Sequence, residues 1–87
     1  MKLMLMVVRD NDAEKVVQEI IQNGCRVTRM ASTGGFLRRG NATLLAGVED
    51  DQVDTVVAIL RKACSPAEPE QHQATIFVVD MPQYTQV

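Results

Sequence analysis

The stretch from Thr33 to Asn41 carries the residues best suited to bind an anionic ligand, reading Thr-Gly-Gly-Phe-Leu-Arg-Arg-Gly-Asn. Paired glycines allow positive φ and let the backbone approach a ligand, and successive N–H groups in such a turn can hold a phosphate. Arg38 and Arg39 can add positive charge, and Phe36 offers an aromatic face for a base. The segment therefore suits a purine nucleotide. The alternative is a plain hairpin with Phe36 packed under the sheet.

Two residues just before this stretch could serve the same site. Arg26 and Thr28 are two positions apart, so in a strand they share one face, and both could reach a phosphate or a base edge. The alternative is a solvated strand face. The formal net charge is −2, yet four of the nine basic residues cluster here, namely Arg26, Arg29, Arg38 and Arg39. This clustering indicates a local anion site.

The other reactive side chains indicate neither a metal site nor catalysis. His72 is the only histidine, and no cysteine or second histidine is spaced to share a metal with it, so we expect it on the surface. No nucleophile, base and orienting group occur together, so we predict a protein that is not an enzyme and has no cofactor. Acidic residues precede both predicted helices, where capping and the helix dipole explain them: Asp10, Asp12, Asp50 and Asp51.

Four runs of residues predict strands. The run 3–8 is continuously apolar and closed by Arg9, which favours a strand buried on both faces, and the run 74–79 is similar. The run 25–33 places Cys25 and Val27 on one face, opposite Arg26 and Thr28. The run 42–48 predicts the fourth strand.

Two amphipathic helices separate these strands. We expect Asn11 and Glu14 to form a capping box at the start of the first helix, Asn23 and Gly24 to end it, and residues 49–51 to cap the second. Four apolar positions recur at an offset of 40 residues: Ala13, Val16, Val17 and Ile20 in the first helix, and Val53, Val56, Val57 and Leu60 in the second. Ile21 extends the expected apolar face of the first helix, and Cys64 that of the second.

The order of these elements predicts the fold. Two strand–helix–strand halves favour an α+β, ferredoxin-like βαββαβ arrangement, with a four-stranded antiparallel sheet covered by helices on one face. The other face would be bare and apolar, which favours packing against copies of the chain. At 87 residues the chain has room for one hydrophobic core, so we expect a single domain, 1–87.

Composition narrows the class of protein. Hydrophobic residues make up 46%, as in an ordinary globular protein, and the net charge argues against general binding to nucleic acid or membranes. The run 3–8 is too short for a signal core or a membrane span, so we expect a cytoplasmic protein. Cys25 and Cys64 are expected to be buried free thiols.

The sequence resembles the PII-like cyclic di-AMP receptor proteins of bacteria over nearly its whole length. The resemblance runs from the opening Met-Lys-Leu strand through residues 31–41, then Gly47-Val48, to residues 74–78. The pattern Thr-Gly-Gly-Phe-Leu-Arg-x-Gly-Asn is its most specific part. It implies a ferredoxin-like homotrimer that takes part in signal transduction, binds cyclic di-AMP or a related nucleotide in clefts between subunits, and acts on an unknown downstream protein.

The resemblance also implies which residues meet the ligand. Phe36 would lie against the first adenine and Phe77 would cover an adenine from the last strand. The remaining implied contacts come from the second strand, the loop, the third strand and the C-terminus: Arg26, Thr28, Gly35, Leu37, Asn41, Gly47 and Gln86.

The chain departs from the family pattern at three places. Gly24 stands where the family often has an asparagine, the connection from Ser65 to Gln73 replaces a long loop, and the tail 81–84 differs. The short connection favours an alternative in which the chain is an oligomeric interaction module. A sensor of another adenine nucleotide, such as ATP, is a further alternative.

Overall fold

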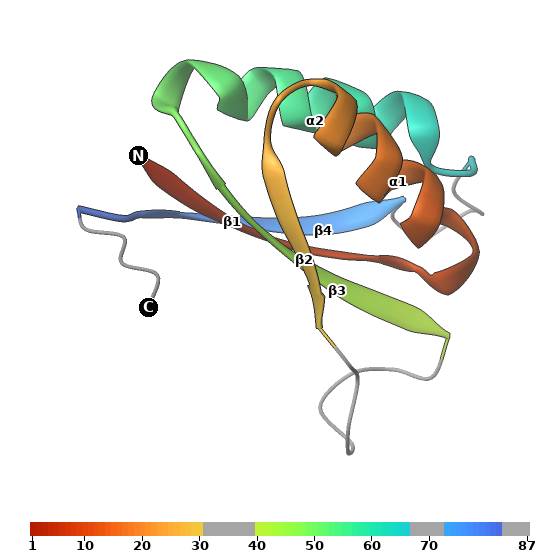
Figure 1. Ribbon diagram of the computed structural model, residues 1–87. Helices are drawn as coiled ribbons and strands as arrows, with labels where there is room; N and C mark the ends of the chain where they lie inside the picture. Colours follow the sequence, from red (N-terminus) through yellow and green to blue (C-terminus); the bar gives the residue numbers. More distant parts are fainter. Residues whose placement is uncertain (31–39, 67–72, 83–87) are drawn as a thin grey trace.

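The computed structural model describes residues 1–30, 40–66 and 73–82. In chain order the elements are β1 (Lys2–Arg9), α1 (Asp10–Gln22), β2 (Arg26–Met30), β3 (Asn41–Val48), the short 3-10 helix η1 (Asp50–Gln52), α2 (Val53–Ala63) and β4 (Ala74–Asp80). The strands form one antiparallel sheet in the order β2-β3-β1-β4, and both helices lie on the same face of it (Figure 1). The predicted α+β, ferredoxin-like arrangement is confirmed.

The core lies between the sheet and the two helices. Alternate residues of β1 and β3 point into it, and the helices contribute the apolar stripe expected from their spacing, except that Ile21 is 53% exposed and lies outside the core. The fully buried large side chains are Met4, Met6, Val8, Val16, Ile20, Leu44, Val48, Val56 and Leu60. The described residues show no helix that is long and apolar enough to cross a membrane.

The expectation that the first and last strands are buried on both faces is wrong for the single chain. In β1 only every second residue is buried, and Leu3, Leu5 and Val7 are half-buried on the face away from the helices. β4 is an edge strand, and Phe77 on it is 57% exposed. Two helices can cover only one face of the sheet, so the apolar residues of the opposite face remain accessible.

The predicted start of α1 also needs correction. Asp10 is the first helical residue rather than the cap, Arg9 occupies the cap position, and no side chain closes that end. The capping box of Asn11 and Glu14 is therefore not formed. Asp10 instead pairs with Arg29 of β2 at 3.3 Å, and its charge still complements the helix N-terminus. The end of α1 is as expected, since Gly24 follows it with φ of 82°.

The predicted cap of the second helix, within residues 49–51, is confirmed at Glu49 and wrong for Asp50. Glu49 occupies the cap position before η1, and its N–H donates to the side-chain oxygen of Gln52 at 2.8 Å. Asp50 does not cap the helix; its carboxylate pairs with the N-terminal amine of Met1 at 3.3 Å. Asp10 thus links the start of α1 to β2, and Asp50 links η1 to the N-terminus of the chain.

Both cysteines are buried free thiols, as expected. Cys64 follows the last residue of α2, where burial, followed by the negative charge of Asp12, raises the pKa of its thiol. The thiol is therefore protonated at neutral pH.

Asp12 joins the start of α1 to the end of α2. It is only 6% exposed, and its carboxylate accepts the Ser65 N–H at 3.1 Å and the Ser65 hydroxyl at 2.8 Å. These bonds link residues 53 positions apart in the sequence. They fix the point at which the chain leaves α2.

We predict that Asp12→Ala lowers the free energy of unfolding by about 1–3 kcal/mol, because it leaves the Ser65 donors without their acceptor. Urea denaturation followed by circular dichroism measures the change. Asp54→Ala, which removes an exposed carboxylate from the first turn of α2, is the control and should cost much less. Equal losses for the two variants would contradict the role of Asp12.

Candidate ligand-binding site

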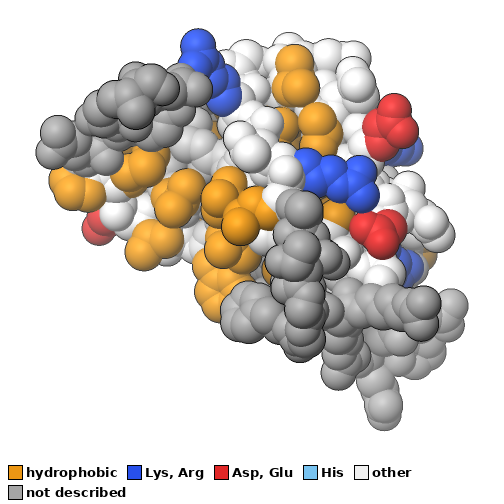
Figure 2. Space-filling model, turned by 60° about the horizontal axis from the view of Figure 1, so that its bottom comes forward, with side chains coloured by type: hydrophobic (Ala, Val, Ile, Leu, Met, Phe, Trp, Pro, Cys, Tyr) orange, Lys and Arg blue, Asp and Glu red, His pale blue; other side chains and the backbone are white. Residues whose placement is uncertain are grey.

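The sheet face away from the helices, here called the open face, holds several of the residues expected to bind a ligand. The strand register places side chains in rows across it, since directly paired residues point to the same side. One row is Arg26, Gly47, Leu3 and Val79, and the next is Thr28, Leu45, Leu5 and Phe77. Figure 2 views the molecule from this side and shows hydrophobic side chains gathered over the sheet.

A pocket of about 380 Å³ lies at the β2 side of this face. Three residues predicted from the sequence line it: Arg26, Thr28 and Gly47. The other lining residues are Met1, Leu3, Leu45, Ala46 and Met81. The pocket therefore has a cation and a hydroxyl at one edge and apolar groups elsewhere, a composition that suits a ligand with both an anionic group and a flat apolar group.

Because Gly47 has no side chain, the Met81 side chain can lie close to the backbone of β3 inside this pocket. A Cβ added at this position would lie 3.2 Å from the terminal methyl group of Met81. The Met81 side chain thus takes the space that the missing side chain leaves. Gly47 and Met81 together shape one wall of the pocket.

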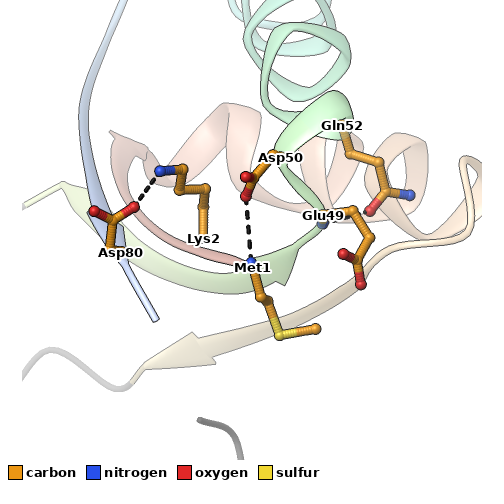
Figure 3. A network of polar contacts seen from close by, with 6 residues as sticks. All are labelled: Met1, Lys2, Glu49, Asp50, Gln52 and Asp80. Carbon is orange, nitrogen blue, oxygen red and sulfur yellow. Dashed lines mark hydrogen bonds and ion pairs between the residues drawn. The ribbon is translucent and has the colours of Figure 1, made fainter. Parts of the chain in front are cut away.

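Polar contacts at the adjoining end of the sheet hold Met1 and Met81 in position. The Met1 carbonyl accepts the Met81 N–H at 3.0 Å, and the Met1 amine pairs with Asp50. Lys2 pairs with Asp80 of β4; this hydrogen bond, followed by the charge of the partner, raises the pKa of Lys2 and lowers the pKa of Asp80. Figure 3 shows the Met1 amine turned toward Asp50 while its thioether points away from that carboxylate.

The structure does not bring all the predicted residues together. Asn41 and Gly47 lie six residues apart on β3, which corresponds to about 20 Å along a strand. Phe77 is three strands from Thr28 in the same row, or about 14 Å. Neither Asn41 nor Phe77 lines the pocket that contains Arg26.

Four predicted residues cannot be placed. Gly35, Phe36 and Leu37 of the glycine-rich segment, and Gln86 near the C-terminus, lie outside the described residues. The same holds for Arg38, Arg39 and His72. Within the described ranges, no group of three histidine, cysteine or acidic residues is arranged to hold a metal ion.

Sequence reasoning missed most of the apolar lining of the pocket. Leu3 and Leu45 could have been found, because the expected alternation and strand order place them on the same face as Arg26. Neither the apolar alternation nor the strand order predicted that Met81 would line the pocket. Its position depends on a hydrogen bond to Met1, at the opposite end of the chain.

Comparison with known proteins gives two findings. The family model described as cyclic-di-AMP receptor matches residues 1–71. A crystal structure of a functionally unknown protein from Pediococcus pentosaceus is similar to the whole fold, with a TM-score of 0.77 and 30% sequence identity. That similarity covers 99% of this chain and 96% of the other, so the two chains are close in length.

We predict that Gly47→Ala changes the free energy of unfolding by less than about 0.5 kcal/mol, because its Cβ meets only the flexible end of a methionine side chain. Thermal and urea denaturation measure this. A loss well above that value would mean that Met81 cannot move aside and that the wall is rigid.

Proposed function

The chain belongs to the cyclic-di-AMP receptor family, and from that premise we propose that it binds cyclic di-AMP at the open face through the residues set out below. The family match over residues 1–71 supports cyclic di-AMP as the ligand, and the matched range contains Arg26, Thr28, the segment 33–41 and Gly47 but not Phe77 or Gln86. The chain is thus a cyclic di-AMP binding protein of signal transduction, and the proposal concerns how it binds.

Within the site, Arg26 and Thr28 would bind phosphate oxygens of the ligand, because a guanidinium and a hydroxyl can both donate to them. The family pattern assigns the other loop and strand residues of the site to contacts with the adenine bases. Phe36 would stack on one adenine and Phe77 on the other, with Gly35, Leu37, Asn41, Gly47 and Gln86 completing the contacts.

The separation of these residues supports a site built from more than one subunit. Within one chain, Asn41 lies about 20 Å along β3 from Gly47, and Phe77 lies about 14 Å across the sheet from Thr28, so a site that uses all four residues is more readily built from two subunits. We propose a homotrimer of single-domain subunits, 1–87, with ligand pockets between neighbouring subunits. Burial of the apolar open face would stabilise this assembly.

The proposal also concerns the lack of catalysis, the downstream partner and the cellular compartment of the protein. Binding is not accompanied by catalysis, and the bound state is read by a downstream protein rather than by nucleic acid or a membrane. Two buried free thiols fit a reducing compartment, so we place the protein in the bacterial cytoplasm.

Calorimetric titration of the purified chain tests the ligand. We expect cyclic di-AMP to bind more tightly than cyclic di-GMP or ATP. Arg26→Ala should weaken binding of cyclic di-AMP about 10- to 100-fold, since it removes a charge-assisted hydrogen bond, and the loss should be greater at low salt than at high salt.

Arg29→Ala is the matched control for this titration. Arg29 lies on the same strand but points to the opposite side, where it pairs with Asp10, so its removal takes away the same charge without touching the pocket. Equal losses for both variants would mean that Arg26 acts only through net charge. Tighter binding of ATP would favour the mononucleotide sensor, and no binding at all would favour the interaction module.

Light scattering tests the assembly. We predict a trimer at micromolar concentration and a folded monomer for Leu5→Lys, because that change places a charge at the centre of the open face. Ile21→Lys, at a position 53% exposed on α1, is the control and should remain trimeric. A parent chain that stays monomeric would refute the trimer and the pocket between subunits.

A further inference from the structure

We propose that Met81 is a further ligand contact: its thioether, packed on Gly47, forms the apolar wall against which one adenine of cyclic di-AMP packs. This inference rests on the proposed function and adds to it a residue that the loop and strand pattern does not include. The juxtaposition of Met81, Gly47 and Arg26 in one pocket carries it.

Gly47 explains why the Met81 side chain reaches the pocket. The terminal methyl group of Met81 lies 3.2 Å from the point where a Cβ at position 47 would stand. A larger residue at 47 would push this methyl group out of the wall. The glycine therefore serves as a seat for Met81, in addition to any direct contact that it makes with ligand.

A hydrogen bond fixes the backbone of Met81 in position, whereas its side chain can rotate about several bonds. Its N–H donates to the Met1 carbonyl at 3.0 Å, and the preceding residue, Asp80, pairs with Lys2. Beyond its Cα, however, the side chain has three rotatable bonds and a polarisable sulfur, which let methionine fit an aromatic face closely. A fixed anchor with an adaptable end suits a wall that closes on a bound base.

The arrangement of the pocket assigns this wall to a base and not to a phosphate. Arg26 pairs directly with Gly47 across neighbouring strands, which lie about 5 Å apart. A phosphate bound at Arg26 and Thr28 therefore leaves the adjoining part of the nucleotide over Gly47. There it meets the thioether of Met81 and the side chain of Leu3, which offer no hydrogen-bond donor to a phosphate.

Methionine methyl NMR tests the contact directly, because the chain has only five methionines. In the parent protein labelled at the methionine methyl carbons, saturating cyclic di-AMP should shift the Met81 proton signal to high field, since the methyl group would lie over the face of a purine ring. Met4 and Met6 are fully buried beneath the helices and serve as internal references that should move least.

Variants give the matching affinity test. Met81→Ala should weaken binding of cyclic di-AMP about tenfold through the loss of apolar contact, and the loss should not depend on salt. Met81→Leu keeps the apolar bulk and should bind within about threefold of the parent. Ile21→Ala, an equally apolar truncation on exposed α1, should leave affinity unchanged.

The outcomes separate this inference from the proposed function. If the parent binds cyclic di-AMP while the Met81 methyl signal stays in place and Met81→Ala binds as tightly as the parent, only the role of Met81 is overturned. If the parent fails to bind, the proposed function and this inference fall together. Thermal unfolding of Met81→Ala checks that lost affinity is not lost folding, and the NMR result on the parent decides the matter whether or not that variant folds.

Discussion

The structure depends on one constraint: two helices can cover only one face of a four-stranded sheet. β1 shows it most clearly, because it lies between β3 and β4 and alternates residue by residue between the two faces. Met4 and Met6 are sealed beneath the helices, while Leu3 and Leu5 face the other way. A strand that is apolar on both sides has its full burial only when a second layer covers the open face.

That constraint also locates the site. The open face combines apolar residues in its central strands with polar ones, Arg26 and Thr28, on the edge strand β2. Such a boundary between apolar and polar surface can contact a nucleotide base and its phosphate at once. Gly47 lies at this boundary, where its missing side chain leaves room for Met81 and a hollow beside the cation. The site therefore follows from the alternation of the strands as much as from any single residue.

Much of the fold could be predicted from local patterns, because helical spacing and strand alternation reflect burial within a few residues of each other. The apolar stripes of both helices apart from Ile21, the turn at Gly24 and the side of β2 that carries Arg26 were predicted correctly. The errors have longer-range causes. Asp10 was expected to cap its own helix but pairs with Arg29, and Asp12 finds its partner at Ser65, after α2. No local pattern reveals such partners.

The sequence likewise predicted some residues of the candidate site correctly and missed others. Arg26, Thr28 and Gly47 came together because one register places their strands side by side, and the family pattern named all three. Asn41 and Phe77 share the face but not the pocket. The spacing of Asn41 from Gly47 along one strand can be read from the sequence, whereas the distance of Phe77 from Thr28 depends on the strand order, which residue types do not give. Met81 joined the pocket through a contact between the two ends of the described chain, which no motif contains.

The separation of Arg26 from Asn41 and Phe77 has a thermodynamic consequence. In the proposed trimer, a ligand that meets Arg26 of one subunit and Phe77 of another binds the assembled form better than the isolated chain. Linkage then requires the ligand to stabilise the assembly by the same free energy by which assembly improves ligand affinity. The open face would thus have two roles with one cause. In the proposed trimer its apolar residues would hold the subunits together, and the small polar region at its edge would make that association sensitive to a nucleotide. A chain of this size with a second layer of helices would gain a complete core but lose the surface on which both roles depend.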